Sequence, residues 1–373
     1  MSHQSTCAAM GGASVLVIGG TSFIGRATVR ALLDAGHVVT ICNRGQTPNP
    51  FGDAVAHRKV DRRRRPEQLQ AVLSCGWDAV IDFVAFNEDD LQPILAAAVH
   101  LKRYIFISTD SVYMACEPSA FLFDERTRLL EASDTTHSAE RARRDEYGNN
   151  KLAAENSLRR HGGSLDWLAL RLPDVLGPHE NTGRQEKLFL KLAKGRTIGS
   201  AISGTNPDAG ATLPLSLVFA DDVASAAVAA LRLPSPFPTR ALHICAAESP
   251  TWQELVHLVA DSLRSHGVHV PEPRFDEARD TGLVSVDCGA LSDRTARSVL
   301  AGWIPKGLEP RIEEAVTWWV QTMREQQAAT EAEGMQTAAA RERKRTSEAA
   351  LAEALAATRS PRRETEDFRF DLK

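Results

Sequence analysis

Tyr147 and Lys151 lie four residues apart in the stretch DEYGNNKLAAE. On a helix this spacing places both side chains on one face, one turn apart. A tyrosine has a pKa of about 10 and is a weak base at neutral pH, but an ammonium one turn away favours its phenolate form. Such a pair can take the proton from a hydroxyl group whose carbon loses hydride. The same spacing also occurs on ordinary polar helices, so the surrounding residues must decide between the two interpretations.

Hydroxyl and carboxyl side chains follow the apolar run RYIFIST at 103–109. This run predicts a buried strand, and Ser108, Thr109, Asp110 and Ser111 stand at its carboxyl end. In a parallel α/β sheet that end faces the ligand. Thr109 can then hydrogen-bond the reacting oxygen, while Tyr147 moves the proton and Lys151 activates Tyr147 and holds a ribose. We therefore expect Thr109, Tyr147 and Lys151 to be catalytic.

A glycine-rich turn in VLVIGGTSFIGR, residues 15–26, joins a predicted strand to a predicted helix. Main-chain N–H groups and the positive end of a helix dipole meet there, which suits a pyrophosphate. In the first βα unit of an alternating chain the turn predicts a dinucleotide site, although a tight turn in a cofactor-free fold is the alternative. We assign these residues to the site: Gly19, Gly20, Thr21, Ser22, Phe23, Ile24 and Gly25.

The next strand ends in Asn43 and Arg44 and carries no carboxylate. A carboxylate there commonly binds the ribose hydroxyls of NAD, whereas a guanidinium grips a 2′-phosphate, so the sequence favours NADP over NAD. Arg44 could instead stack on adenine. Asp61 is expected to hydrogen-bond the adenine amino group. The four arginines at 62–65 could assist the 2′-phosphate, contact RNA or lie in a solvated loop, and a solvated loop is favoured for at least two of them.

Strands and amphipathic helices alternate from residue 14 to Pro173, which predicts a doubly wound parallel (Rossmann) sheet. We expect a dinucleotide-binding domain at 14–173 plus about 214–247, and a smaller α/β substrate lobe at 174–213 plus 248–322. A leader covers 1–13. The Ala-rich charged segment 323–373 is expected to be a solvated helix or disordered, with binding of a partner as the alternative.

The composition is that of an ordinary globular protein, with 43% hydrophobic and 25% charged residues. A net charge of −4 argues against a nucleic-acid footprint over the whole protein. The six cysteines have no metal-ligand spacing, so we expect reduced thiols and no metal site. The leader has no apolar core and no segment spans a bilayer, so the expected location is the cytoplasm rather than a membrane.

With these motifs, the chain resembles the extended short-chain dehydrogenases/reductases, a family that includes nucleotide-sugar epimerases and dehydratases. The resemblance runs from about residue 14 to 320. It rests on GGTSFIG, FISTDSVY, the acidic pair at 124–125, YGNNKLAAE, LALRLPDVLGP and VFADDVA. It implies that Thr109, Tyr147 and Lys151 are catalytic, that Gly19 and Gly25 belong to the cofactor loop, and that Pro173 begins the stretch that reaches the nicotinamide. We assign Val84 and Ala85, which lie near the end of the fourth predicted strand DAVIDFVAF, to the cofactor site as well.

The chain departs from the family pattern at Ser22 and Ser111. Ser22 replaces the usual middle glycine of the loop, where its Cβ could crowd the pyrophosphate or its hydroxyl could bind it. Ser111 stands where the dehydratases carry a glutamate acid, which argues against sugar 4,6-dehydration. Within the family, GGTSFIG, NRGQTP and PDVLGP are most similar to the chloroplast stem-loop-binding proteins and their bacterial relatives.

The expected function is therefore that of an NAD(P)-dependent oxidoreductase or epimerase. The substrate is expected to be a small molecule, either a nucleotide sugar or another hydroxyl or carbonyl compound. The alternative is a cofactor-binding, RNA-associated protein with little or no turnover, but the plant stem-loop-binding proteins do not keep the full catalytic set. Retention of Tyr147 and Lys151 favours the enzyme. A homodimer is one candidate for the oligomeric state.

Overall fold

The structure is a computed structural model that describes residues 12–115, 122–124, 129–131, 146–161, 165–201, 214–281, 283 and 290–331. It contains two compact units, Met1–Trp318 and Trp319–Lys373. Nearly all of the expected leader and the tail beyond residue 331 lie outside the described residues. Between 308 and 331 the chain is helical. Among the described helices, none has the length and apolar character needed to cross a bilayer.

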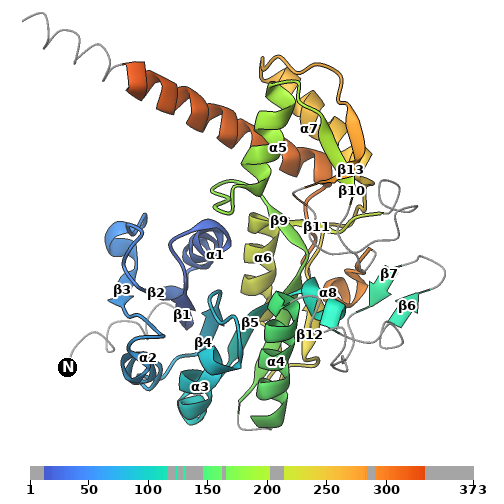
Figure 1. Cartoon of the computed structure of the whole chain (residues 1–373). Helices are drawn as coiled ribbons and strands as arrows, with labels where there is room; N and C mark the ends of the chain where they lie inside the picture. Colours follow the sequence, from blue (N-terminus) through green and yellow to red (C-terminus); the bar gives the residue numbers. More distant parts are fainter. Residues whose placement is uncertain are drawn as a thin grey trace, which may run out of the picture. The chain divides into compact units, whose positions relative to one another are not determined.

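The first unit is built on a seven-stranded parallel sheet, which confirms the expected fold class (Figure 1). Its spatial order is β3-β2-β1-β4-β5-β8-β12. The strands are β1 (Ser14–Ile18), β2 (Val38–Asn43), β3 (Ala56–Lys59), β4 (Ala79–Asp82), β5 (Tyr104–Thr109), β8 (Trp167–Leu172) and β12 (Ala241–His243). The order reverses between β1 and β4, and doubly wound sheets bind ligands beside such a reversal.

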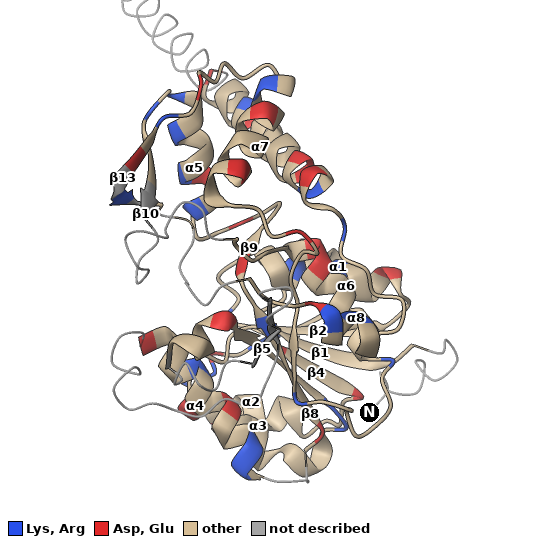
Figure 2. Ribbon diagram, turned by 90° about the vertical axis from the view of Figure 1, so that its right-hand side faces the viewer, with Lys and Arg blue, Asp and Glu red and all other residues tan. Residues whose placement is uncertain are grey.

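Helices cover both faces of this sheet. Helices α1 (Phe23–Asp34) and α6 (Ala220–Ala230) lie on one face, and α2 (Pro66–Leu73), α3 (Glu88–Ala96) and α4 (Glu146–His161) lie on the other (Figure 2). Strand β1 shows why both faces are apolar, because alternate side chains point in opposite directions. Val15 and Val17 pack in the core with α1 and α6, whereas Leu16 and Ile18 pack in the core with α2, α3 and α4.

The unit also contains helices and strands outside the main sheet and the five helices named above. They include α5 (Arg184–Ala193), α7 (Trp252–Ser265) and α8 (Arg294–Val299). The two-stranded sheets pair β9 (Asp174–Leu176) with β11 (Leu217–Phe219), β10 (Ile198–Ala201) with β13 (Phe275–Asp280), and β6 (Leu122–Asp124) with β7 (Leu129–Glu131). Short 3₁₀ helices are η2 (Gly52–Ala54), η3 (Ala98–His100) and η4 (Asp110–Ala115).

The parallel β10–β13 pair joins the two separated stretches that we assigned to the substrate lobe. Both stretches up to Trp318 belong to the same compact unit as the main sheet. Strand β11 pairs with β9 outside the seven-stranded sheet, while β12, the next strand in the chain, is one of the two edge strands of that sheet. The precise boundaries of the lobe stay a prediction.

A buried ion pair fastens α4 to the sheet. The Arg171 guanidinium on β8 donates from Nη2 to Glu155 Oε2 at 2.6 Å and from Nε to Oε1 at 3.1 Å. Ser108 Oγ donates to the same carboxylate at 2.6 Å. Burial alone would raise the pKa of Glu155, but Arg171 and these hydrogen bonds hold that pKa below its usual value. The pair therefore fixes the helix that carries Tyr147 and Lys151.

We expect Arg171→Met to lower the free energy of unfolding by about 3–5 kcal/mol, because it leaves the Glu155 carboxylate buried without a cation. Glu155→Gln combined with Arg171→Met should recover much of this loss. Urea unfolding followed by tryptophan fluorescence measures both. Arg160→Met is the control, because the side chain of Arg160 is exposed and its pair with Glu88 should contribute less than about 1 kcal/mol. An equal loss of unfolding free energy in Arg171→Met and in the double variant would contradict the expectation.

Candidate active site

A cavity of about 1470 Å³ runs along the carboxyl ends of the parallel strands. The loops after β1, β2, β3, β4, β5 and β8 all contribute to its walls. The three residues assigned to catalysis, Thr109, Tyr147 and Lys151, line this cavity together. So do these residues assigned to the cofactor: Gly19, Thr21, Ser22, Phe23, Ile24, Gly25, Asn43, Arg44, Asp61, Val84 and Pro173. Of the assigned residues, all within the described part of the chain, Gly20 and Ala85 lie outside the lining.

The turn between β1 and α1 has the geometry of an anion cradle. Gly19 has a φ of +97°, which side-chain-bearing residues rarely adopt. A Cβ on Gly25 would lie 2.2 Å from the main-chain oxygen of Gly19, so only glycine fits there. A Cβ on Gly20 would meet Val29 and Val17 in the core, which gives Gly20 a packing role. The amino end of α1 opens into the cavity, and its free N–H groups and dipole suit a phosphate.

Ser22 does not distort this turn. It is the residue before α1 and has an extended backbone, with φ of −133° and ψ of 150°, which any residue can adopt. The loss of the usual glycine at this position therefore has no backbone cost. Phe23, the next residue, has a φ of +40° and is buried at the cavity wall. The strained residue of the loop is thus Phe23 rather than Ser22.

The ends of β2 and β3 form the cationic end of the cavity. Asn43 Nδ2 donates to Thr21 Oγ1 at 2.9 Å, and Asn43 Oδ1 accepts from the Gly45 amide at 2.7 Å. Asn43 therefore holds the two loops together. Arg44 is exposed and lines the cavity, as do Arg63 and Arg64. No carboxylate stands at the end of β2, so the residues present suit a 2′-phosphate.

Asp61 lies at the start of the loop after β3. Its Oδ1 accepts hydrogen bonds from the amides of Arg63 at 3.1 Å and Arg64 at 3.2 Å. The hydrogen bond from the Arg64 amide is the main reason that the pKa of Asp61 is lowered, so Asp61 is a carboxylate at neutral pH. An ionised carboxylate can accept a hydrogen bond from an exocyclic amine.

The four arginines at 62–65 do not behave alike. Arg63, Arg64 and Arg65 have exposed side chains, as expected for a solvated loop. Arg62 is different: its side chain is only 10% exposed and forms an ion pair with the fully buried Asp82 on β4. The sequence could not predict which arginine is buried, because the four stand side by side and are identical in type.

Tyr147 and Lys151 lie one turn apart on α4, as their spacing predicts. Tyr147 is 46% exposed, and Lys151 is 2% exposed. Thr109, at the end of β5, is buried; its Oγ1 lies 3.2 Å from both Asp110 Oδ1 and Ser111 Oγ and accepts from the Ser111 amide at 3.1 Å. Thr109 therefore has a fixed orientation at the cavity wall.

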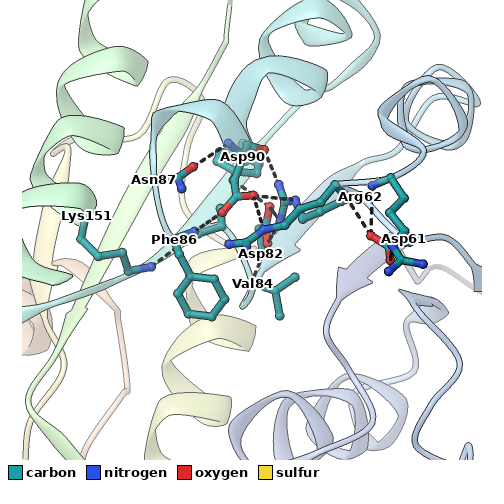
Figure 3. Close-up of polar contacts among 12 residues, drawn as sticks. Asp61, Arg62, Asp82, Val84, Phe86, Asn87, Asp90 and Lys151 are labelled. Atoms are coloured by element: carbon teal, nitrogen blue, oxygen red, sulfur yellow. Dashed lines mark hydrogen bonds and ion pairs between the residues drawn. The ribbon is translucent and has the colours of Figure 1, made fainter. Parts of the chain in front are cut away.

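Main-chain carbonyls compensate the buried ammonium of Lys151. Its Nζ donates to Ala85 O at 2.8 Å and to Ile107 O at 2.6 Å, and lies 4.4 Å from the centre of the Phe106 ring. Figure 3 shows the Lys151 side chain pointing towards the loop that carries Phe86. Burial lowers the pKa of Lys151 to about 8, although the Asp82 and Glu155 carboxylates oppose the shift. An ammonium has three donors, and these carbonyls use two of them. Ala85 thus acts on the site indirectly: its main-chain carbonyl binds the Lys151 ammonium, although Ala85 itself does not line the cavity.

A carboxyl group beside Thr109 also lines the cavity. Asp110 is buried, and burial together with the neighbouring Asp174 raises its pKa well above the usual value. Asp174 accepts from Arg184 Nη1 at 2.6 Å. Asp174, Thr182 and Arg184 also line the cavity, and they belong to the chain after Pro173, where sequence reasoning assigned no site residue. The polar cluster NTGR at 181–184 was the available signal.

Two curated relatives resemble this chain. It is 28% identical over 209 residues to the chloroplast stem-loop binding protein of 41 kDa b from Arabidopsis thaliana, covering 51% of this chain and 49% of the relative. It is 29% identical over 145 residues to 2′-dehydrokanamycin reductase from Streptomyces kanamyceticus, covering 39% of this chain and 37% of that protein. The chain thus matches about half the length, or less, of these relatives.

Solved structures share the fold. The UDP-glucose 4-epimerase of Thermotoga maritima with UDP-glucose has a TM-score of 0.63 at 18% identity, covering 83% of this chain and 99% of that one. The UDP-glucose 4-epimerase of Thermus thermophilus in complex with NAD has a TM-score of 0.61 at 21% identity, and the match covers 82% of this chain and 98% of that one.

The resemblance found in the motifs is confirmed by a family model. The model of the NAD dependent epimerase/dehydratase family matches residues 15–245, from the first strand of the sheet to just beyond its last. This match covers more than half of the chain, and the protein therefore belongs to the NAD dependent epimerase/dehydratase family.

Proposed function

We propose that the protein is an NAD(P)-dependent oxidoreductase or epimerase that acts on a nucleotide sugar or another hydroxyl or carbonyl substrate. The observation that carries the proposal is that Thr109, Tyr147 and Lys151 line the same cavity as the glycine turn at Gly19–Gly25. The named activities of the relatives support it, since one is a reductase and the structural neighbours include UDP-glucose 4-epimerases.

The three residues have distinct roles in this proposal. A bound nicotinamide supplies a hydride acceptor or donor. The Tyr147 hydroxyl moves the proton of the reacting hydroxyl or carbonyl oxygen, and its exposed position lets a substrate reach it. Lys151 favours the phenolate form and holds a ribose with its remaining donor, and Thr109 orients the reacting oxygen by a hydrogen bond.

The proposed cofactor is NADP(H) in preference to NAD(H). The exposed guanidinium of Arg44 stands at the end of β2, with Arg63 and Arg64 on the same cavity. Guanidinium groups bind a phosphate dianion through paired hydrogen bonds, whereas a carboxylate at the same place would repel it.

A second candidate is an RNA-associated protein that binds the cofactor with little turnover. The exposed side chains of Arg58, Lys59 and Arg63–Arg65 and the name of the plant relative support it. The two candidates differ in their response to salt and to Tyr147→Phe. RNA binding that falls steeply with salt, with no turnover and no effect of Tyr147→Phe, would favour this second candidate.

Tyr147→Phe should leave NADPH affinity nearly unchanged, because only a hydroxyl is lost. Turnover should fall by about a hundred- to ten-thousandfold, the usual contribution of a positioned acid/base group. Lys151→Met should lower both NADPH affinity and turnover, because the same ammonium is proposed to stabilise the phenolate and to bind the ribose. The measurements are quenching of protein fluorescence by NADPH, and isotope exchange between labelled cofactor and a panel of nucleotide sugars. Exchange that survives Tyr147→Phe undiminished would contradict the role of Tyr147.

Arg44→Ala should weaken NADPH binding by about ten- to a hundredfold, the equivalent of about 1.5–3 kcal/mol for hydrogen bonds to a charged group, and leave NADH binding unchanged. Arg58→Ala is the matched control, because Arg58 is an exposed arginine of β3 and is not among the described residues that line the cavity. Titration of both cofactors measures the effect. Equal wild-type affinities for the two cofactors, unchanged by Arg44→Ala, would exclude the NADP preference.

The protonation of Lys151 should be visible in stability. Its pKa is about 8 in the folded protein and 10.5 as the ordinary value, so between these pH values the unfolded chain binds more protons there. The unfolding free energy of wild type should therefore rise with pH relative to that of Lys151→Met, by about 2 kcal/mol between about pH 7.5 and 9.5. Urea unfolding at several pH values tests this. A difference that is independent of pH would contradict the lowered pKa.

A further inference from the structure

A polar cluster lies between the cationic end of the cavity and Lys151. It consists of Arg62, Asp82, Asp90 and Tyr104, and is called the Arg62 cluster below. Arg62 Nη1 donates to both carboxylate oxygens of Asp82, at 2.9 and 3.1 Å, and Nη2 donates to the main-chain carbonyl of Asp90. The Tyr104 hydroxyl donates to Asp82 Oδ2 at 3.0 Å. Asp82 is fully buried, so this group needs a nearby cation, and Arg62 provides it.

The two carboxylates of the cluster hold the loop between β4 and α3. Asp82 Oδ1 accepts from the Val84 amide at 2.9 Å, and Asp90 Oδ2 accepts from the Phe86 amide at 2.8 Å. The residue between these two amides is Ala85, whose carbonyl accepts from Lys151 Nζ at 2.8 Å. One of the two carbonyls that bind the lysine is therefore fixed on both sides by the carboxylates of Asp82 and Asp90 (Figure 3). Arg62 links these two residues through the Asp82 carboxylate and the Asp90 main-chain carbonyl.

Arginine suits this position better than lysine. Its planar guanidinium presents donors in several fixed directions, so one head group reaches the Asp82 carboxylate and the Asp90 carbonyl together. A lysine ammonium could neutralise Asp82 as a point charge but would not span both groups in the same way. The cluster thus depends on the shape of the arginine head group as well as on its charge.

We propose that Arg62 is a positioning residue for the active site: it holds the 84–86 loop so that Ala85 O binds and orients Lys151. This inference rests on the proposed function in so far as it assigns catalysis to Lys151. Because Arg62 follows Asp61 directly and itself lines the cavity, it also ties the loop at the adenosine end to the loop beside the lysine. Its substitution should impair turnover more than cofactor binding.

Charged groups from several elements face Lys151, and each bears on its titration. Asp82 on β4, Asp90 on α3 and Glu155 on α4 favour the ammonium, whereas Arg62 opposes it. Loss of the Arg62 charge removes a repulsion and favours the charged lysine, whereas release of the loop that holds Ala85 O weakens a hydrogen bond to the ammonium and opposes it. Arg62→Lys keeps the charge, so only the second effect remains and the titration midpoint of Lys151 should fall in that variant. A purely structural ion pair would lower stability, but in Arg62→Lys, which keeps the charge, it would leave the Lys151 midpoint and the turnover of the folded protein unchanged.

The test compares Arg62→Met, Arg62→Lys and the control Arg65→Met in the full chain. Arg65 belongs to the same run, but its side chain is exposed and it is not among the described residues that line the cavity. In protein labelled with [ε-¹³C]lysine, the Lys151 resonance is identified by its loss in Lys151→Met, and its midpoint is read from a pH titration that requires neither substrate nor cofactor. NADPH affinity and kcat for isotope exchange are measured in parallel.

Both Arg62 variants should shift the Lys151 resonance, and Arg62→Lys should lower its midpoint. We expect kcat to fall by about tenfold or more, in the range caused by small misplacements of catalytic groups, with NADPH affinity within about threefold of wild type. Arg65→Met should match wild type throughout. If Arg62→Lys, which keeps the charge and is the variant expected to fold, has the wild-type Lys151 resonance, midpoint and kcat, the proposal is overturned. If wild type itself shows no exchange, the proposed function fails, and the titration alone decides the role of Arg62.

Discussion

The burial of one ammonium group constrains most of the site. Lys151 is almost completely removed from water, and an uncompensated cation in such a place would be very costly. The chain therefore has to supply oxygen atoms around it: the carbonyls of Ala85 and Ile107 in contact, and the carboxylates of Asp82 and Glu155 farther away. These groups come from the β4–α3 loop, β5, β4 and α4. Compensation is incomplete, which is why the pKa falls to about 8, yet the charged form still predominates at neutral pH.

Two buried arginines balance the carboxylates that the lysine requires. Arg171 pairs with Glu155, and Arg62 pairs with Asp82, so neither carboxylate is left to the lysine alone. Buried ion pairs of this kind are weak evidence for stability, because desolvation offsets much of their attraction. Their value here is geometric. One pair fixes α4 against β8, and the other fixes the loop after β3 against β4, and Lys151 lies where α4 meets the β4–α3 loop.

The sequence predicted those parts of the molecule that depend on local patterns. Alternating strands and helices indicated the parallel sheet, the glycine turn indicated the cradle at Gly19 and Gly25, and the spacing of Tyr147 and Lys151 indicated one helical face. The pairing of β10 with β13 was not predictable, because these short strands meet from stretches far apart in the chain. Arg62 could not be distinguished from Arg63–Arg65 either. Its burial depends on Asp82, which lies on another strand, and no local pattern records that partner.

Helix α4 carries a graded stripe of polar groups from the cavity into the core. Tyr147, Lys151 and Glu155 follow one another at four-residue spacing, so they share one face of the helix. Their exposures are 46%, 2% and 0%. In the proposed mechanism the group that meets a substrate, Tyr147, is thus the accessible one, and the cation proposed to tune it, Lys151, is kept from water, where its field is stronger. Glu155, which ends the stripe, cannot take part in proton transfer with a substrate; it anchors the helix through Arg171. In that mechanism a single helical face separates contact with substrate, electrostatic tuning and anchorage by depth.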